Sequence, residues 1–266
     1  MKNIIIFLYL TIKSLIRDRI FLIIIALCLL FLCVPVFSSF SMRQCQEVGI
    51  TMCLTINSFI LLLLSIFSGM STIWRDIEKK SIYTLLSYPI SRSEYLIGRI
   101  FGCVILLLII SIINIIISIP IIKICAGMYK SSLSIKWGNI ILAYITIFLK
   151  YVILLSVSFV AISFSTSFFT PFFITIACYI SGNSIQSIFD YIFKETGKNY
   201  PLWFKEIIKS IYYIIPNFAF FDLTPYAAYS LKIDTHSVII TILYSLTYTT
   251  IMLALSCTIF SKKDLL

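Results

Sequence analysis

Charged residues are scarce in this chain. Only 12% of its 266 residues carry charge, whereas 60% are apolar, and the mean hydropathy is +1.05. A soluble domain is roughly half apolar and about a quarter charged, so a chain of this length could not hide so much apolar surface from water. The composition therefore excludes an ordinary soluble protein and indicates that lipid surrounds much of the chain.

Residues that bind metals or carry out catalysis are also sparse. The chain has one histidine, His236, and its eight cysteines include no Cys-x-x-Cys pair, so neither a zinc nor a haem site is expected. Cys45, Cys53 and Cys125 fall near one predicted face, where one disulfide could form. No nucleophile–base pair and no paired carboxylates occur within the apolar runs. We therefore predict no catalytic residues and no metal site.

The sequence also lacks a Gly-x-x-x-x-Gly-Lys-Ser/Thr loop, the backbone cradle that holds phosphate in many ATPases. The chain cannot hydrolyse ATP by that route. Its formal net charge of +10 does not indicate nucleic-acid binding, because the basic residues flank apolar runs, as expected beside anionic lipid headgroups. A cleavable signal peptide is a poor fit, because a long basic amphipathic stretch precedes the first apolar run.

Six apolar stretches are long enough to cross about 30 Å of hydrocarbon, which takes about 20 helical residues. They cover residues 20–40, 51–73, 100–122, 140–164, 168–188 and 237–260. They are apolar on all sides, which predicts helices rather than the alternating strands of a barrel. We expect an all-α integral membrane protein that forms a single domain over residues 1–266.

Residues 1–19 precede the first stretch. Ile5, Leu8 and Ile12 follow helical spacing, while Lys13 and Arg17 lie on another face. This pattern predicts an N-terminal elbow helix in the headgroup layer; the alternative is that it extends the first span. With the N-terminus inside, five of the six arginines fall on the inner side. We therefore predict the plasma (cytoplasmic) membrane, with both termini cytoplasmic.

The last outer loop, residues 189–236, contains structure of its own. Residues 202–215 show helical spacing that Pro216 ends, and Thr224 and Pro225 resemble the cap and first position of another short helix. These outer-leaflet helices could form a gate at Pro216, Asn217 and Phe218, or a lid with no moving part.

The inner segment between the second and third spans, residues 74–99, is dense in charge. Pro89 ends a short predicted helix, and Ser91 with Glu94 predicts a capping box for the next one. A short helix followed by a sharp elbow could transmit a push from a soluble partner into two spans. The alternative is an ordinary connecting loop with capped helices.

This segment resembles the coupling segment of type-2 ABC (ATP-binding cassette) exporter permeases. The resemblance lies in Glu78-x-x-Ser81-x-x-Thr84-x-x-x-x-Pro89-Ile90-Ser91-Arg92-x-Glu94-Tyr95-x-x-Gly98-Arg99. Ser81 stands where glycine is common, the threonine is displaced, and Arg99 replaces lysine. The outer stretches Ile215–Phe218 and Phe221–Leu223 and the basic tail at 260–265 are similar to the same family.

The resemblance implies six spans behind an elbow helix, with two such subunits, as a homodimer or heterodimer, assembled on two ATPase subunits. ATP and Mg²⁺ would bind to that partner, and no cofactor to this chain. The residues implied to couple to the ATPase are Arg75, Glu78, Thr84, Pro89, Ser91, Arg92, Glu94, Gly98 and Arg99.

Three polar residues within the spans are candidates for a transport pathway. Lys150 lies mid-span, where an ammonium is costly, so it either faces a cavity or partner or extends to the interface. Asn57 and Asn114 either line the pathway or bond neighbouring helices. We expect a permease subunit of an ATP-driven exporter; a membrane scaffold is the alternative, and a membrane enzyme lacks the polar groups it would need.

Overall fold

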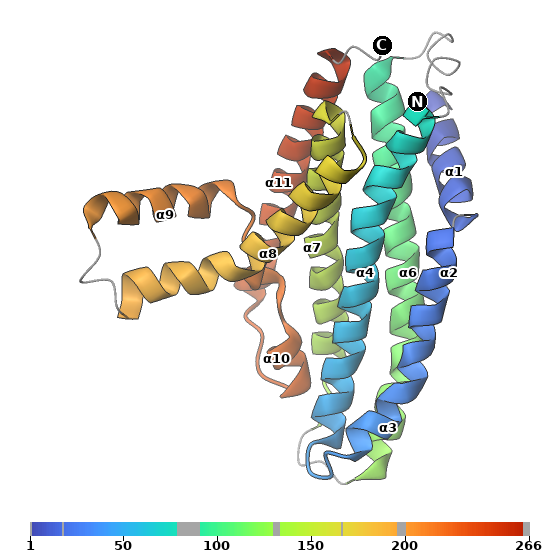
Figure 1. The fold of residues 1–266 in the computed structure, drawn as a ribbon. Helices are drawn as coiled ribbons and strands as arrows, with labels where there is room; N and C mark the ends of the chain where they lie inside the picture. Colours follow the sequence, from blue (N-terminus) through green and yellow to red (C-terminus); the bar gives the residue numbers. More distant parts are fainter. Residues whose placement is uncertain are drawn as a thin grey trace.

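The computed structural model describes residues 2–17, 19–78, 91–129, 134–165, 167–195 and 201–262. All regular structure within these ranges is helical. The helices form an elongated bundle, and the first helix begins at the end of the bundle where the last one finishes (Figure 1). An even number of membrane crossings requires this arrangement.

Six spans among the described residues are long and apolar enough to cross a membrane. The first combines α2 (Arg19–Cys28), η1 (Leu29–Cys33) and α3 (Val34–Ser39), and the others are α4 (Cys45–Glu78), α6 (Arg92–Met128), α7 (Trp137–Phe164), α8 (Phe169–Asp190) and α11 (Thr235–Lys262). The predicted all-α fold with six spans is confirmed.

The helices α4 and α6 extend well beyond the apolar stretches that predict them. They contain 34 and 37 residues, which gives lengths of about 51 and 56 Å against about 30 Å of hydrocarbon. The charged residues at their inner ends mark the limit of the apolar run but do not stop the helix, because Arg, Glu and Lys are good helix formers.

The first span is not one continuous helix. A tighter 3-10 stretch, Leu29–Cys33, comes directly before α3, which carries Pro35 in its first turn. Proline has no N–H to donate, and its ring clashes with the carbonyl four residues earlier. The proline therefore accounts for the break.

A separate helix precedes the first span, as predicted. This helix, α1 (Lys2–Ile16), packs against the first turns of α6. The ring of Phe7 meets that of Tyr95 edge-on at 5.3 Å. A Cβ on Gly102 would lie 2.6 Å from the Cβ of Thr11, so the two helices approach closely because glycine has no side chain. These contacts anchor α1 to the bundle.

The most enclosed span is α7. Its most apolar window is 61% buried, against 17% for α8 and for α11. It packs against α4, α8 and α11, and Tyr144, Tyr151 and Phe159 on it are fully buried. The helices α4, α6 and α7 therefore form the core, while α8 and α11 keep broad apolar faces exposed.

All eight cysteines are free thiols. Cys45 and Cys125 both contact the hydroxyl of Ser38, at 3.5 and 3.2 Å. Of the three cysteines expected near one face, Cys45 and Cys125 therefore lie beside the same side chain, that of Ser38. Both are free thiols and do not form a disulfide.

The outer loop contains the short helices expected from its sequence. After the π-helical turn η2 (Tyr191–Glu195), α9 (Leu202–Ile214) runs back along the later part of α8, and these two segments project sideways from the bundle (Figure 1). The turn η4 (Ala219–Phe221) and the helix α10 (Thr224–Ala228) follow. The expectation that Thr224 caps α10 is wrong. Thr224 is its first helical residue, and the carboxylate of Asp222 accepts from the Thr224 N–H at 3.1 Å.

The segment before η4 packs directly onto α8. Phe218 N–H donates to the carbonyl of Gly182 at 3.0 Å. A Cβ on Gly182 would lie 2.6 Å from both the Phe218 ring and the carbonyl oxygen of Pro216. The absence of a side chain at Gly182 therefore allows the outer loop to reach the span.

Substituting Gly182 by alanine should lower the free energy of unfolding by about 1–3 kcal/mol, because the backbone oxygen of Pro216 cannot move aside as a flexible side chain could. Thermal unfolding of the purified chain in detergent measures the loss. Gly138→Ala is the matched control, since nothing lies within 4 Å of a Cβ there. Equal melting temperatures for the two variants would contradict the close packing.

Candidate functional site

The helix that follows the predicted coupling segment begins with a reciprocal cap. Ser91 Oγ accepts from the Glu94 N–H at 3.2 Å, and Glu94 Oε2 accepts from the Ser91 N–H at 3.3 Å. The predicted capping box is confirmed, and it sets the start of α6 at Arg92. Thr84 and Pro89, also predicted to act in coupling, lie outside the described residues.

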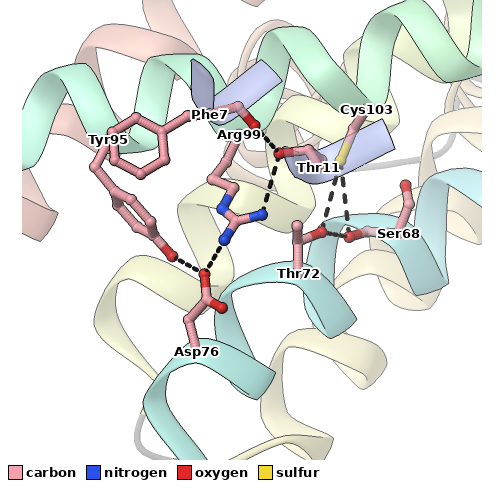
Figure 2. A network of polar contacts seen from close by, with 8 residues as sticks. All are labelled: Phe7, Thr11, Ser68, Thr72, Asp76, Tyr95, Arg99 and Cys103. Carbon is pink, nitrogen blue, oxygen red and sulfur yellow. Dashed lines mark hydrogen bonds and ion pairs between the residues drawn. The ribbon is translucent and has the colours of Figure 1, made fainter. Parts of the chain in front are cut away.

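A buried ion pair joins the two helices that flank this segment. Arg99 of α6 is 5% exposed and donates through Nη2 to Asp76 Oδ2 of α4. Tyr95, one turn before Arg99, donates its hydroxyl to the same carboxylate oxygen (Figure 2). A buried charge needs a partner and additional hydrogen bonds to be tolerated, and Asp76 has both.

The network reaches two further helices. Arg99 Nη1 donates to Thr11 Oγ1 of α1 at 3.2 Å, and the Thr11 hydroxyl donates to the carbonyl of Phe7 at 2.7 Å. The ring of Tyr95 stacks against Phe260 of α11, with ring centroids 6.1 Å apart. The helices α1, α4, α6 and α11 are therefore held together at the end of the bundle that carries both termini.

Two more contacts strengthen this end. Cys103 of α6 lies 3.6 Å from the hydroxyl of Thr72 on α4, one turn beyond the ion pair (Figure 2). Arg92 Nη1 donates to the carbonyl of Ser261 near the end of α11 at 3.2 Å. Of the other residues predicted here, Gly98 is buried, Arg75 is half-buried and Glu78 is exposed.

Sequence reasoning missed three members of this network: Thr11, Asp76 and Tyr95. A signal was present for two of them. Tyr95 and Arg99 are four residues apart, so they share a helix face. Asp76 and Arg99 have opposite charges at the facing ends of consecutive spans. No comparable signal pointed to Thr11.

The asparagines predicted as pathway residues bond one another. Asn114 Nδ2 of α6 donates to Asn57 Oδ1 of α4 at 3.0 Å, and both side chains are fully buried. Cys28 of α2 donates to Asn114 Oδ1 at 3.6 Å. This geometry matches the alternative in which the amides bond neighbouring helices.

Lys150 faces both a helix partner and a cavity. Its ammonium donates to Asn183 Oδ1 of α8 at 2.8 Å. Asn183 presents its oxygen because its Nδ2 donates to the carbonyl of Tyr179 at 2.8 Å. Lys150 also lines a cavity of about 150 Å³ between α4, α7 and the outer loop. Of the three pathway candidates, Lys150 is thus the one that both bonds a neighbouring helix and lines a cavity.

The residues predicted as an outer gate are packed tightly. Asn217 Nδ2 donates to Gln186 Oε1 of α8 at 2.6 Å, and its backbone N–H donates to the hydroxyl of Tyr244 on α11 at 3.1 Å. Phe218 is fully buried, and its ring lies 5.6 Å from the Lys150 ammonium. Pro216, Asn217 and Phe218 therefore bridge α8 and α11 beside Lys150.

Six apolar spans, held together by polar bonds at the end where the first helix begins and the last one finishes, define a multi-pass integral membrane protein of all-helical fold. The family model described as ABC-2 family transporter protein matches residues 10–265, and the chain belongs to this family. It is a membrane transport subunit of the permease type rather than a catalytic enzyme, and its family works in general with an ABC ATPase. No curated protein matches the chain.

Asp76→Asn or Arg99→Gln should each lower the free energy of unfolding by about 3–5 kcal/mol, because either change leaves one charge buried without its counter-charge. The double variant should lose less than the sum of the two losses, and Tyr95→Phe should lose about 1 kcal/mol. Thermal unfolding in detergent completes the double-mutant cycle. Arg43→Gln, at an exposed arginine, is the control. Additive losses would show that the pair does not couple.

Proposed function

We propose that the chain is the membrane-spanning permease subunit of an ATP-driven ABC exporter. A separate cytoplasmic ABC ATPase, which carries the ATP and Mg²⁺, binds at residues 74–99. A second permease subunit, identical or closely related, completes the assembly in the plasma membrane, surrounded by lipid. Both termini then lie in the cytoplasm.

The observation that carries this proposal is the ion pair between Arg99 and Asp76. The helices on either side of residues 79–90 are joined to each other by this pair and to α1 and α11 by Thr11 and Phe260. Separating a buried pair costs about 3–5 kcal/mol. A push on the intervening segment would therefore move four helices together before it parted any two of them.

A gate on the transport path is supported by the contacts of the outer loop. Pro216, Asn217 and Phe218 bridge α8 and α11 beside Lys150. A movement of the inner ends that tilts α8 or α11 would break the bonds of Asn217 and open a path past Phe218. In this proposal, Pro216, Asn217 and Phe218 form the outer gate.

A membrane scaffold is the competing function, because six spans and a capped inner helix would serve it equally well. The discriminating property is the response of an ATPase. A permease changes the hydrolysis rate of its partner when the coupling segment is altered, whereas a scaffold does not.

Arg92→Glu should reduce the stimulation of the partner ATPase by the permease about fivefold or more, within the range of ordinary coupling free energies. The change reverses a charge within the coupling segment, yet α6 should still form, because an acidic residue suits the first turn of a helix. The measurement is ATP hydrolysis in proteoliposomes that contain the co-purified complex.

Arg43→Glu makes the same charge change at the opposite end of the bundle and should leave the rate unaltered. Unchanged hydrolysis with Arg92→Glu, or failure of any ATPase to co-purify with the chain, would favour the scaffold.

The orientation can be tested by labelling a thiol introduced at Ser87, in a background without the eight native cysteines. Ser87→Cys should react with a membrane-impermeant maleimide only after cells are permeabilised, whereas Arg43→Cys should react in intact cells. Labelling of Ser87→Cys in intact cells would place the coupling segment on the wrong side of the membrane and end the proposal.

A further inference from the structure

The cavity beside Lys150 carries charges of both signs. Its polar lining comes from Thr55 and Ser58 of α4, Lys150 of α7, and Asp222 and Thr224 of the outer loop. Lys150 lies at the middle of α7, far from the ends of the helix where headgroups would meet it. The outer loop thus brings a carboxylate toward a lysine deep in the bundle.

Three aromatic rings and one amide surround the end of the Lys150 side chain. The rings of Tyr179, Phe218 and Tyr151 lie 5.3, 5.6 and 5.8 Å from Nζ, and ring faces attract cations. Asn183 Oδ1 accepts a hydrogen bond from one N–H group of Lys150. An ammonium has three such donors, so the cavity wall offers donors to a further acceptor.

Asp222 and Lys150 line the same cavity, but within the part of the chain that the structure describes no salt bridge joins them. The carboxylate is exposed, and its Oδ1 accepts from the Thr224 N–H at 3.1 Å. Two opposite charges that face one cavity without touching fit a ligand that itself carries both charges. A purely anionic ligand would be repelled by Asp222, and a purely cationic one by Lys150.

The size of the cavity limits what can enter. A volume of about 150 Å³ corresponds to roughly five water-sized groups, enough for a polar head but not for a whole amphiphile. A second cavity of about 500 Å³ also has Asp222 in its wall. Most of its other lining residues are apolar or aromatic, such as Phe220 and Ile240, and Lys232 and Asp234 add charge at its wall. An apolar body could occupy this larger space while the head occupies the smaller one.

We propose that the two cavities together bind a zwitterionic amphiphile, with its oxyanion against Lys150, its ammonium at Asp222 and its apolar body in the larger cavity. Binding is a property of this chain alone and goes beyond the proposed function. That the ligand is cargo, held part-way across the bilayer, rests on the proposed function.

The test uses the full-length purified chain in detergent and short-chain phospholipids as probes. Native mass spectrometry measures the affinity for phosphatidylethanolamine, phosphatidylcholine, phosphatidylglycerol and soluble phosphoethanolamine. Phosphatidylethanolamine should bind tightest, because it alone combines an oxyanion, an ammonium with N–H groups and an apolar body. Equal affinity for the three lipids would overturn the site, and equal affinity for phosphoethanolamine would overturn the amphiphile.

Lys150→Gln should lower the affinity for phosphatidylethanolamine about tenfold or more, since a charged hydrogen bond is lost. Asp222→Asn should lower it as well but raise the affinity for phosphatidylglycerol, because the repulsive carboxylate is gone. Lys209→Gln and Glu206→Gln, on the exposed face of α9, are the matched controls.

Lys150→Met provides a second variant of similar length if the glutamine variant does not fold. Unchanged lipid ranking in the Lys150 and Asp222 variants would overturn the proposal. Failure of the unaltered chain to bind phosphatidylethanolamine, with intact ATPase stimulation, would refute the site but leave the coupling function standing.

Discussion

The pairing of Arg99 with Asp76 is the interaction on which the inner half of the bundle depends. Each charge alone would cost several kcal/mol where it lies, at the junction of long apolar helices. The two charges stabilise each other, and Tyr95 and Thr11 supply further hydrogen bonds. The bundle can therefore hold both charges, and the hydrogen bonds fix their geometry. Because apolar side chains gain little from leaving lipid for one another, these polar bonds determine how α1, α4 and α6 are placed relative to one another.

Two groups of charged side chains in the bundle differ in how they are bonded. The inner network is closely bonded: its carboxylate takes two donors, and its guanidinium bonds two helices, while the buried Nε of Arg99 has no partner among the described residues. The region of Lys150 differs, because its ammonium and the carboxylate of Asp222 face a space rather than each other. Charges in direct contact suit a fixed joint, and charges that face a cavity without touching suit a place where something binds. The division matches what a permease needs, namely a rigid connection to its motor and an adaptable interior.

Much of the fold could be predicted from the sequence, because long apolar runs leave few alternatives in lipid. The capping box at Ser91 and Glu94 could be predicted as well, since it depends only on neighbours along the chain. The helix ends could not, because hydropathy detects contact with lipid and not the end of a hydrogen-bonding pattern. The neighbours of Lys150 could not be predicted either, because Phe218 and Asp222 come from a loop some seventy residues away. The amides of Asn57 and Asn114 suited a pathway and a helix contact equally well, and only their distance decided between them.

The length of α4 and α6 has a geometric consequence. Each is a rod about 20–25 Å longer than the hydrocarbon is thick, and the two are fastened to each other near one end. If that end is the fulcrum, a tilt of about 10° carries the far tip of α4 through an arc of roughly 9 Å. Small angular steps by a soluble machine on one side of a membrane would then appear as large excursions on the other, without any helix having to bend.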